Sequence, residues 1–162
     1  MSAPRYASLG LALGLVMLFA QVAGASHYRL PASGITTKEE ARQLASQKIT
    51  TTKKLLKAAA KKRDRRALAK STGIAGKRLF ELVSLCDLLR VDGIGPSVAR
   101  LLTLSGAPDL SALKRQGSGS LLSQMKAANA KHGIMEVLPR QETLGAWIKS
   151  ASGMPKLIEG KR

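Results

Sequence analysis

The segment from Gly76 to Arg90 constrains the fold of this chain more than any other. Its sequence, GKRLFELVSLCDLLR, places large apolar residues almost all round the helix that it predicts. Between its first turn and its last residue, Glu81, Ser84 and Asp87 interrupt the apolar surface as a narrow polar stripe. A helix that is apolar on most sides must be covered by neighbours from several directions. We therefore expect this helix at the centre of the fold.

Turn and capping residues divide the rest of the chain into short helical segments. Thr37-Lys38-Glu39-Glu40 has capping-box spacing and predicts a helix that ends near Gln47. Gly-Ser-Gly-Ser at 117–120 predicts a flexible break and a possible helix cap. The other predicted helices begin at Thr50 to Thr52, run from Asp64 to Ser71 with Gly73 as a stop, from Pro96 to Ser105 with Gly106 as a stop, from Asp109 to Gln116, from Leu121 to about Gly133, and from Pro139 to Ala151. No strand pattern is convincing, so we predict an all-α fold.

The first 25 residues form a separate hydrophobic segment. Arg5 precedes an apolar run from Leu9 to Ala20, and Ala23-Gly24-Ala25 supplies the small residues that a signal peptidase reads. This layout predicts a signal peptide that is cleaved after Ala25. An uncleaved membrane anchor also fits, because the apolar segment is about long enough to span a bilayer. An organelle-targeting leader is a third interpretation, since no acid occurs before Glu39.

The charge balance favours an anionic partner. The chain has 27 Lys and Arg against 10 Asp and Glu, a formal net charge of +17. Nine basic residues and one acid lie between Lys48 and Arg66. Nucleic acid, an acidic membrane surface and an acidic protein would each suit such a surface, and composition does not choose among them. The same run is also typical of a solvated helix face.

A helix-hairpin-helix is predicted where LLRVDGIGPSVARLL runs from Leu88 to Leu102. Gly93 and Gly95 let the backbone turn sharply between two apolar segments. Pro96 suits the first turn of the following helix, where its missing N–H costs nothing. Ile94 is expected to point back between the two helices.

A weaker copy of this pattern lies twenty residues upstream, in LAKSTGIAGKRL. Gly73-Ile74 aligns with Gly93-Ile94, whereas Ala75 replaces the second glycine, which is lost or displaced to Gly76. The two hairpins would share the central helix in a tandem, SAM-like arrangement. We thus divide the chain into a leader or anchor (1–25), a linker with one short helix (26–50), a tandem hairpin domain (51–151) and a disordered basic tail (152–162).

A glycine turn before a helix leaves backbone N–H groups exposed at the positive end of that helix, which is a site for a phosphate group. Contacts of this kind go to the nucleic-acid backbone and read no sequence. The same hairpin can also be a packing unit without a ligand. The predicted nucleic-acid-binding residues are Gly93, Ile94, Gly95, Ser97, Arg90, Arg100, Gly73, Gly76, Lys77 and Arg78.

Residues suited to catalysis or metal binding are scattered. Ser118 and Ser120 have no His and Asp partners placed by any pattern, and His27 and His132 are far apart in the chain. Cys86 is the single cysteine, which excludes an intrachain disulfide and favours a small buried apolar residue. We predict no enzyme, no metal ion, no cofactor and no small-molecule substrate.

Four segments, in order, resemble a known family: LLKAAAKKRDRRALAKSTGI, LCDLLRVDGIGPSVARLLTLSGAPDLSALKRQ, LLSQMKAANAKHGIMEVLP and ETLGAWIKSA. Residues from about Thr51 to Ala151 thereby resemble the domain of unknown function four-three-three-two family, a tandem helix-hairpin-helix composite. The resemblance implies tandem hairpins and carries no known biochemical role. Many members have an acid-rich VNEEK where this chain has Ala128-Asn129-Ala130-Lys131, a departure that makes it more basic.

These observations lead to one main hypothesis and two alternatives. The main hypothesis is a non-enzymatic, exported or membrane-anchored module that contacts duplex nucleic acid through backbone phosphates. The first alternative is an exported or organellar assembly subunit whose hairpins bind protein partners. The second is a membrane-surface binder that places the Lys48–Arg66 run on acidic lipids. The chain is similar in layout both to competence DNA receptors of the ComEA type, which bind DNA, and to the extrinsic hairpin subunit of photosystem II, which binds protein.

Overall fold

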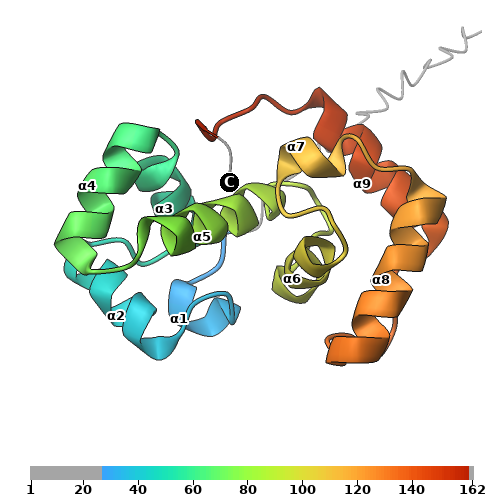
Figure 1. The fold of residues 1–162 in the computed structure, drawn as a ribbon, viewed down its shortest axis with the longest axis horizontal. Coiled ribbons are helices and arrows are strands. Elements are labelled where there is room, and N and C mark those ends of the chain that lie inside the picture. Colours follow the sequence, from blue (N-terminus) through green and yellow to red (C-terminus); the bar gives the residue numbers. More distant parts are fainter. Residues whose placement is uncertain (1–26, 161–162) are drawn as a thin grey trace, which may run out of the picture.

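The computed structural model describes residues 27–160, and within them the fold is all-α, as predicted (Figure 1). Its only extended pairing in that range is an isolated bridge between Arg29 and Thr51. The helices are α1 (Leu30–Ser33), α2 (Lys38–Ser46), α3 (Thr52–Ala59), α4 (Lys62–Thr72), α5 (Gly76–Leu88), α6 (Pro96–Leu104), α7 (Leu110–Leu113), α8 (Ser118–His132) and α9 (Gln141–Gly153).

Helix α5 lies at the centre of the molecule, as its sequence predicts (Figure 1). It packs against α3, α4, α6 and α7. Leu79, Leu82, Val83 and Leu88 are completely buried in it. Two residues of the polar stripe are buried as well, because Ser84 and Asp87 are each only 3% exposed, whereas Glu81 is half-buried. Most of the stripe therefore faces neighbouring elements rather than open solvent.

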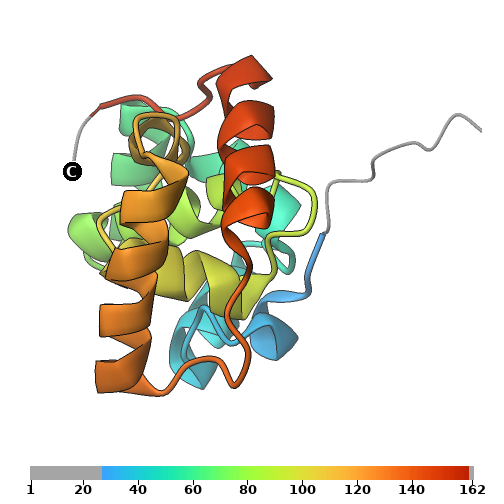
Figure 2. The same cartoon turned by 90° about the vertical axis from the view of Figure 1, so that its right-hand side faces the viewer.

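The remaining helices form two groups on either side of α5 (Figure 1). Helices α1 to α4 make one group, in which α3 and α4 pack on α5 and α2 packs on α4. Helices α6 to α9 make the other, in which α8 packs on both α6 and α9. Figure 2 shows α8 and α9 side by side, joined at one end by the loop that follows α8.

The helix boundaries follow the capping signals. At the start of α2, Thr37 and Glu40 form the expected capping box: the Glu40 N–H donates to Thr37 Oγ1 at 3.0 Å and the Thr37 N–H donates to Glu40 Oε2 at 2.8 Å. Gly73 and Gly106 lie at the predicted stops with positive φ, 74° and 84°. A left-handed residue closes a helix because its N–H returns to an earlier carbonyl.

The segment predicted as a linker, residues 26–50, differs from expectation where it is described. Leu30 and Leu44 are completely buried, and Ile35 and Ile49 are almost so. The Leu30 N–H donates to the Thr50 carbonyl at 3.0 Å. Pro31 and Gly34, which were interpreted as linker signals, instead begin and end the one-turn helix α1. These residues belong to the folded domain because their isolated apolar side chains fill its core.

Two further expectations are wrong. Gly-Ser-Gly-Ser is the predicted cap but no flexible break, because α8 begins at Ser118 with Gly117 as its N-cap. The expected disordered tail is packed as far as Gly160: Ile158 is 6% exposed, and the Glu159 N–H donates to the Ala60 carbonyl at 2.9 Å. The buried Ile158 side chain and the backbone of Glu159, which meets the junction of α3 and α4, hold the tail in place, and local composition shows neither contact.

The predictions for the N-terminal segment concern residues that lie outside the described part of the chain. They are the leader or anchor (1–25) and its cleavage after Ala25. Between residues 27 and 160, none of the helices has the length and apolar character needed to cross a bilayer.

Candidate functional site

The first turn, Thr72–Ala75, joins α4 to α5 and is open to solvent. Gly73 has φ +74° and Ile74 is buried beneath it, while Gly73, Ala75 and Gly76 are exposed. The Thr72 hydroxyl donates to the Leu68 carbonyl at 2.7 Å and accepts from the Ile74 N–H at 3.3 Å, which fixes the turn. Among the described residues, no atom beyond the neighbouring backbone lies within 4 Å of the position that a β-carbon would take on Gly73 or Gly76.

The second turn, Leu89–Gly95, joins α5 to α6 and is partly covered: Asp92 and Gly93 are exposed, whereas Gly95 is half-buried. Gly93 has φ +81°, and Ile94, 2% exposed, donates its N–H to the Val91 carbonyl at 3.1 Å. Trp147 of α9 lies on this turn, with its Nε1 2.9 Å from the position of a β-carbon on Gly93. A side chain at this position would collide with the indole as well as strain the backbone.

Gly95 does not need to be glycine for the reason that the sequence suggested. Its φ is −88° and its ψ is 174°, an extended conformation that any residue adopts. A β-carbon there would lie 3.8 Å from the Tyr28 hydroxyl oxygen, which is ordinary van der Waals contact. The sharp turn therefore depends on Gly93 alone. Tyr28 and Trp147 come from opposite ends of the described chain, so no local pattern could have placed them here.

The starts of α5 and α6 both lack a side-chain cap. The first N–H groups of a helix have no partner within the helix. These groups lie beside Gly76 and Lys77 in α5 and beside Ser97 in α6, all of which are exposed. Both helix starts thus present donors at the positive end of a helix dipole. Arg100, one turn further along α6, is exposed too.

Two of the predicted phosphate-binding arginines are held in ion pairs. Arg78 donates from Nε to Glu40 Oε1 at 2.7 Å and from Nη2 to the Ile35 carbonyl at 3.0 Å, and it also pairs with Glu81. The hydrogen bond to Glu40 raises the pKa of Arg78 and lowers that of Glu40. These contacts tie α2 to α5, so Arg78 has a structural task.

Arg90 is held in the same way at the other end of α5. Its Nη1 donates to Asp87 Oδ1 at 2.5 Å and to the Pro155 carbonyl at 3.2 Å, and only 17% of its side chain is exposed. Burial raises the pKa of Asp87, although Arg90 opposes the shift. The pair neutralises a carboxylate in the interior and anchors the C-terminal segment.

Beside the first turn lies a groove of about 480 Å³ between α4 and α5, which we call the cationic groove. Its exposed cations are Lys62, Arg66, Lys70 and Lys77. The first three are spaced by four residues and therefore share one face of α4. The sequence shows that spacing, although Lys70 lies just beyond the basic run from Lys48 to Arg66. Ion pairs involving these four are absent from the described part of the chain.

One arginine of this region points inward instead. Arg65 donates from Nη1 to the Ala59 carbonyl at 2.7 Å and from Nη2 to the Glu159 carbonyl at 2.7 Å. Its guanidinium lies 5.0 Å from the centre of the Phe80 ring. Burial lowers its pKa. Arg65 therefore fixes the C-terminal segment against α4.

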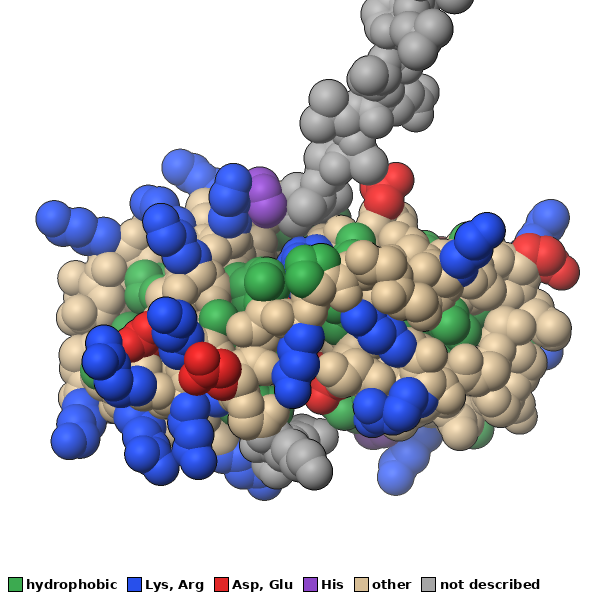
Figure 3. Space-filling model, turned by 90° about the horizontal axis from the view of Figure 1, so that it is seen from above, with side chains coloured by type: hydrophobic (Ala, Val, Ile, Leu, Met, Phe, Trp, Pro, Cys, Tyr) green, Lys and Arg blue, Asp and Glu red, His purple; other side chains and the backbone are tan. Residues whose placement is uncertain are grey.

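Lys and Arg side chains gather at one end of the molecule. Figure 3 shows them crowded at the left, the end formed by α3 and α4, and sparser at the right, where α8 and α9 lie. The cationic groove and the first turn belong to the crowded end. The partly covered second turn lies toward the other group of helices, against α9.

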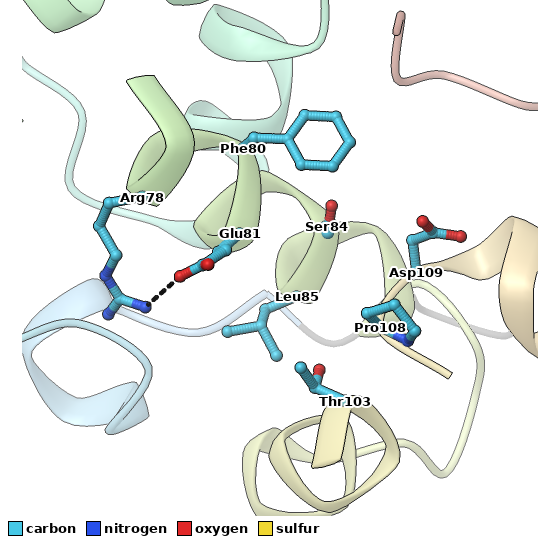
Figure 4. Close-up of a pocket in the computed structure, with 8 residues that line it drawn as sticks. All are labelled: Arg78, Phe80, Glu81, Ser84, Leu85, Thr103, Pro108 and Asp109. Carbon is cyan, nitrogen blue, oxygen red and sulfur yellow. Dashed lines mark ion pairs between the residues drawn. The ribbon is translucent and has the colours of Figure 1, made fainter. Parts of the chain in front are cut away.

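A small cavity of about 70 Å³ separates α5 from α6 and the loop before α7 (Figure 4). Ser84 lines it, and its Oγ has no hydrogen-bond partner among the described residues. Thr103 donates to the Ala99 carbonyl of its own helix at 3.0 Å.

The described residues contain no group of three or more His, Cys, Asp or Glu that could hold a metal ion. Burial raises the pKa of Cys86, which disfavours its nucleophilic thiolate.

These features define a small all-α protein with a strongly basic end and an open glycine turn. The chain belongs to the family described as Domain of unknown function (DUF4332), whose model matches residues 33–154. The match begins within the segment that was predicted as a linker, in agreement with its packing in the core. Comparisons with curated proteins and with solved structures each found no match.

Proposed function

We propose that this protein is a non-enzymatic, tandem helix-hairpin-helix (SAM-like) module that contacts duplex nucleic acid through backbone phosphates without reading sequence. The first hairpin would consist of α4, the first turn and α5, and the second of α5, the second turn and α6. The observation that carries the proposal is the open first turn beside the cationic groove. It combines free N–H donors, a helix dipole and unpaired cations on one surface.

The spacing of the cations suits an extended anion. Lys62, Arg66 and Lys70 follow one another at intervals of about 6 Å along the axis of α4. Lys77 lies across the groove at the start of α5. A phosphate backbone that tracks this row could reach several cations together, with one phosphate at the Gly73–Gly76 end. Each neutralised phosphate would release counterions, which makes affinity fall with salt.

The two turns would then have different tasks. The first would bind phosphate through Gly73, Gly76 and Lys77. The second would mainly pack, because Trp147 lies against Gly93 and leaves little room beside this exposed glycine. Two predicted residues that follow the second turn in α6, Ser97 and Arg100, are exposed and can extend the interface along this helix. Arg78 and Arg90 would support the fold rather than touch nucleic acid.

The test is the salt dependence of duplex binding, measured by fluorescence anisotropy. Four substitutions to Gln in the cationic groove should reduce the slope of log K against log salt by up to about 3.6. A matched control removes four exposed cations from the other end and should change the slope little. The groove set is Lys62, Arg66, Lys70 and Lys77, and the control set is Lys126, Lys131, Arg140 and Lys149. Equal losses in the two sets would mean binding by diffuse charge, and no binding at low salt would end the proposal.

A protein-assembly subunit is the second candidate function. Support for it comes from the second turn, which is already used as a packing unit against α9 rather than as a ligand site. Native co-purification separates the two candidates, since one predicts nucleic acid and the other a stable protein complex. Export, membrane anchoring or an organelle location remains a prediction from the first 25 residues, and N-terminal sequencing that begins at Ser26 would support the signal peptide.

A further inference from the structure

A second groove, of about 510 Å³, lies between α3, α5 and the C-terminal segment. We call it the apolar groove. Leu56, Cys86 and Leu89 form its inner wall and are almost completely buried, and Leu157, 43% exposed, stands at its mouth. Such a volume and such a lining are typical of sites for small molecules. An apolar side chain as exposed as Leu157 gains from any ligand that removes it from water.

The rim of the apolar groove is cationic. Lys53, Lys57 and Lys61 line it at intervals of four residues, so the lysines follow one edge of α3 and its continuation. All three are exposed, and no ion pair to them occurs between residues 27 and 160. Figure 3 shows apolar side chains lying between Lys and Arg side chains on the face seen from above.

The other charged groups that line this groove are already engaged. Arg90 is paired with Asp87 and bonded to the Pro155 carbonyl. The Glu159 carboxylate accepts the Lys62 N–H at 3.1 Å, and so caps the start of α4. The Glu159 carboxylate keeps its negative charge, so the lining carries this one anion against three lysines that have no ion pair within residues 27–160. Their positive charge above an apolar wall complements a molecule with an anionic head and an apolar body.

We propose that the apolar groove binds a free fatty acid as a single monomer, with its acyl chain along Leu56, Leu89 and Leu157 and its carboxylate among the three lysines. The carboxylate would accept charge-assisted hydrogen bonds from the ammonium groups. An alcohol of the same chain length lacks this interaction, and a cationic amphiphile is repelled. The ligand is bound, not transformed. None of the residues that line this groove belongs to the cationic groove, so the two sites are independent.

Isothermal titration of the full chain with dodecanoate, kept below its micelle concentration, tests the proposal. We expect saturable binding of one dodecanoate per chain. Dodecanol and dodecyltrimethylammonium should bind at least about tenfold more weakly, a difference of about 1.4 kcal/mol. Equal binding of all three amphiphiles would overturn the proposal, because the groove would then be a nonspecific apolar patch. Absence of saturable binding would also overturn the proposal. That conclusion would hold even if another part of the chain or a second copy fills the groove.

Two matched pairs of variants place the ligand. Leu157→Asp should weaken dodecanoate binding at least about tenfold, whereas Leu104→Asp, with similar exposure of 48% at a site outside this groove, should not. The double variant Lys53→Gln and Lys57→Gln should weaken it several-fold, against no change for Lys126→Gln with Lys131→Gln. Thermal unfolding checks that each variant is folded. If Leu157→Asp does not fold, the lysine variants alone test the site. Equal effects within each pair would contradict the proposed site.

Discussion

The two glycine turns have the same local design and different surroundings. Each contains Gly-Ile, each places the glycine at positive φ, 74° and 81°, and each buries the isoleucine. The first turn has open space around Gly73, whereas Trp147 lies against Gly93 in the second. Both glycines are exposed, but the turn with the fuller sequence pattern, Gly-Ile-Gly-Pro, is the more crowded one. A turn motif determines backbone shape, and elements distant in sequence determine whether that shape can meet a ligand.

The difference extends to the charges around each turn. Exposed cations free of ion pairs line the groove beside the first turn. Near the second turn, Arg90 is committed to Asp87 and the C-terminal segment. Net charge alone would have placed both turns on one basic surface. Packing and charge pairing distinguish the surroundings of the two turns, which is the basis of the proposed division of roles.

Removal of the cover over the second turn should have the largest effect. Trp147→Ala is expected to cost about 4 kcal/mol of unfolding free energy, because it deletes a large side chain that is 8% exposed. Denaturant unfolding measures this loss. In the Trp147→Ala variant, hydrogen exchange of the Ile94 amide should accelerate relative to the parent, and by more than that of the Ile74 amide. Phe80→Ala, at equal exposure near the first turn, is the control. Equal acceleration of both amides in Trp147→Ala would mean that the indole has no specific role at the second turn.

An added methyl group should distinguish the two glycines directly. Gly73→Ala should cost about 1 kcal/mol, since the residue is left-handed but its surroundings are empty. Gly93→Ala should cost about 3 kcal/mol, because the methyl group also meets Trp147 Nε1. Equilibrium unfolding in urea measures both variants. In the Trp147→Ala background the excess penalty at Gly93 should disappear. Equal losses of stability for Gly73→Ala and Gly93→Ala in the parent chain would show that Trp147 moves aside without cost.

The ion pair that holds Arg78 at the start of α5 should give the smallest effect, visible in the pH dependence of stability. Hydrogen bonding to Arg78 lowers the pKa of Glu40 below its ordinary value. A carboxyl whose pKa is depressed on folding stabilises the protein above its unfolded pKa, and this stabilisation is lost as pH falls through the folded pKa. Between pH 6 and about pH 3, the parent should therefore lose about 1 kcal/mol more than Glu40→Gln.

The neighbouring carboxylate is the control for that measurement. Glu39 pairs with Arg42 on the surface, where both side chains are more than half exposed. Such pairs contribute little to stability. Glu39→Gln should thus follow the parent's pH profile from pH 6 downward. If Glu39→Gln flattens the profile as much as Glu40→Gln, the link between α2 and α5 is not the source of the effect.

Local sequence predicted those parts of the fold that depend on short-range physics. The capping box at Thr37 and Glu40, the left-handed stops at Gly73 and Gly106, and Pro96 at the start of α6 all stand where they were expected. Each depends on hydrogen bonds or steric limits within a few residues. The central position of α5 was also readable, because a helix that is apolar all round has no alternative to burial.

Expectations failed where a few apolar residues lie in polar surroundings. Leu30 and Ile158 each stand in segments whose Pro, Gly and charged residues indicated linker or tail, yet both are buried. A single apolar side chain has no periodicity, so local patterns cannot report its burial. The candidate site shows the same limit. Lys62, Arg66 and Lys70 were visible as a helical face, but nothing in the sequence showed that Arg78 and Arg90 would be paired.

The sequence by itself determined the helical class, the central helix and the shape of both turns, because these follow from backbone sterics and helical periodicity. The tertiary structure decided which turn has free space around its glycine. It brings Tyr28 and Trp147, more than a hundred residues apart in the chain, to the second turn and leaves the first beside unpaired cations. Exposure and charge pairing depend on contacts between distant elements, and those contacts exist only once the chain has packed.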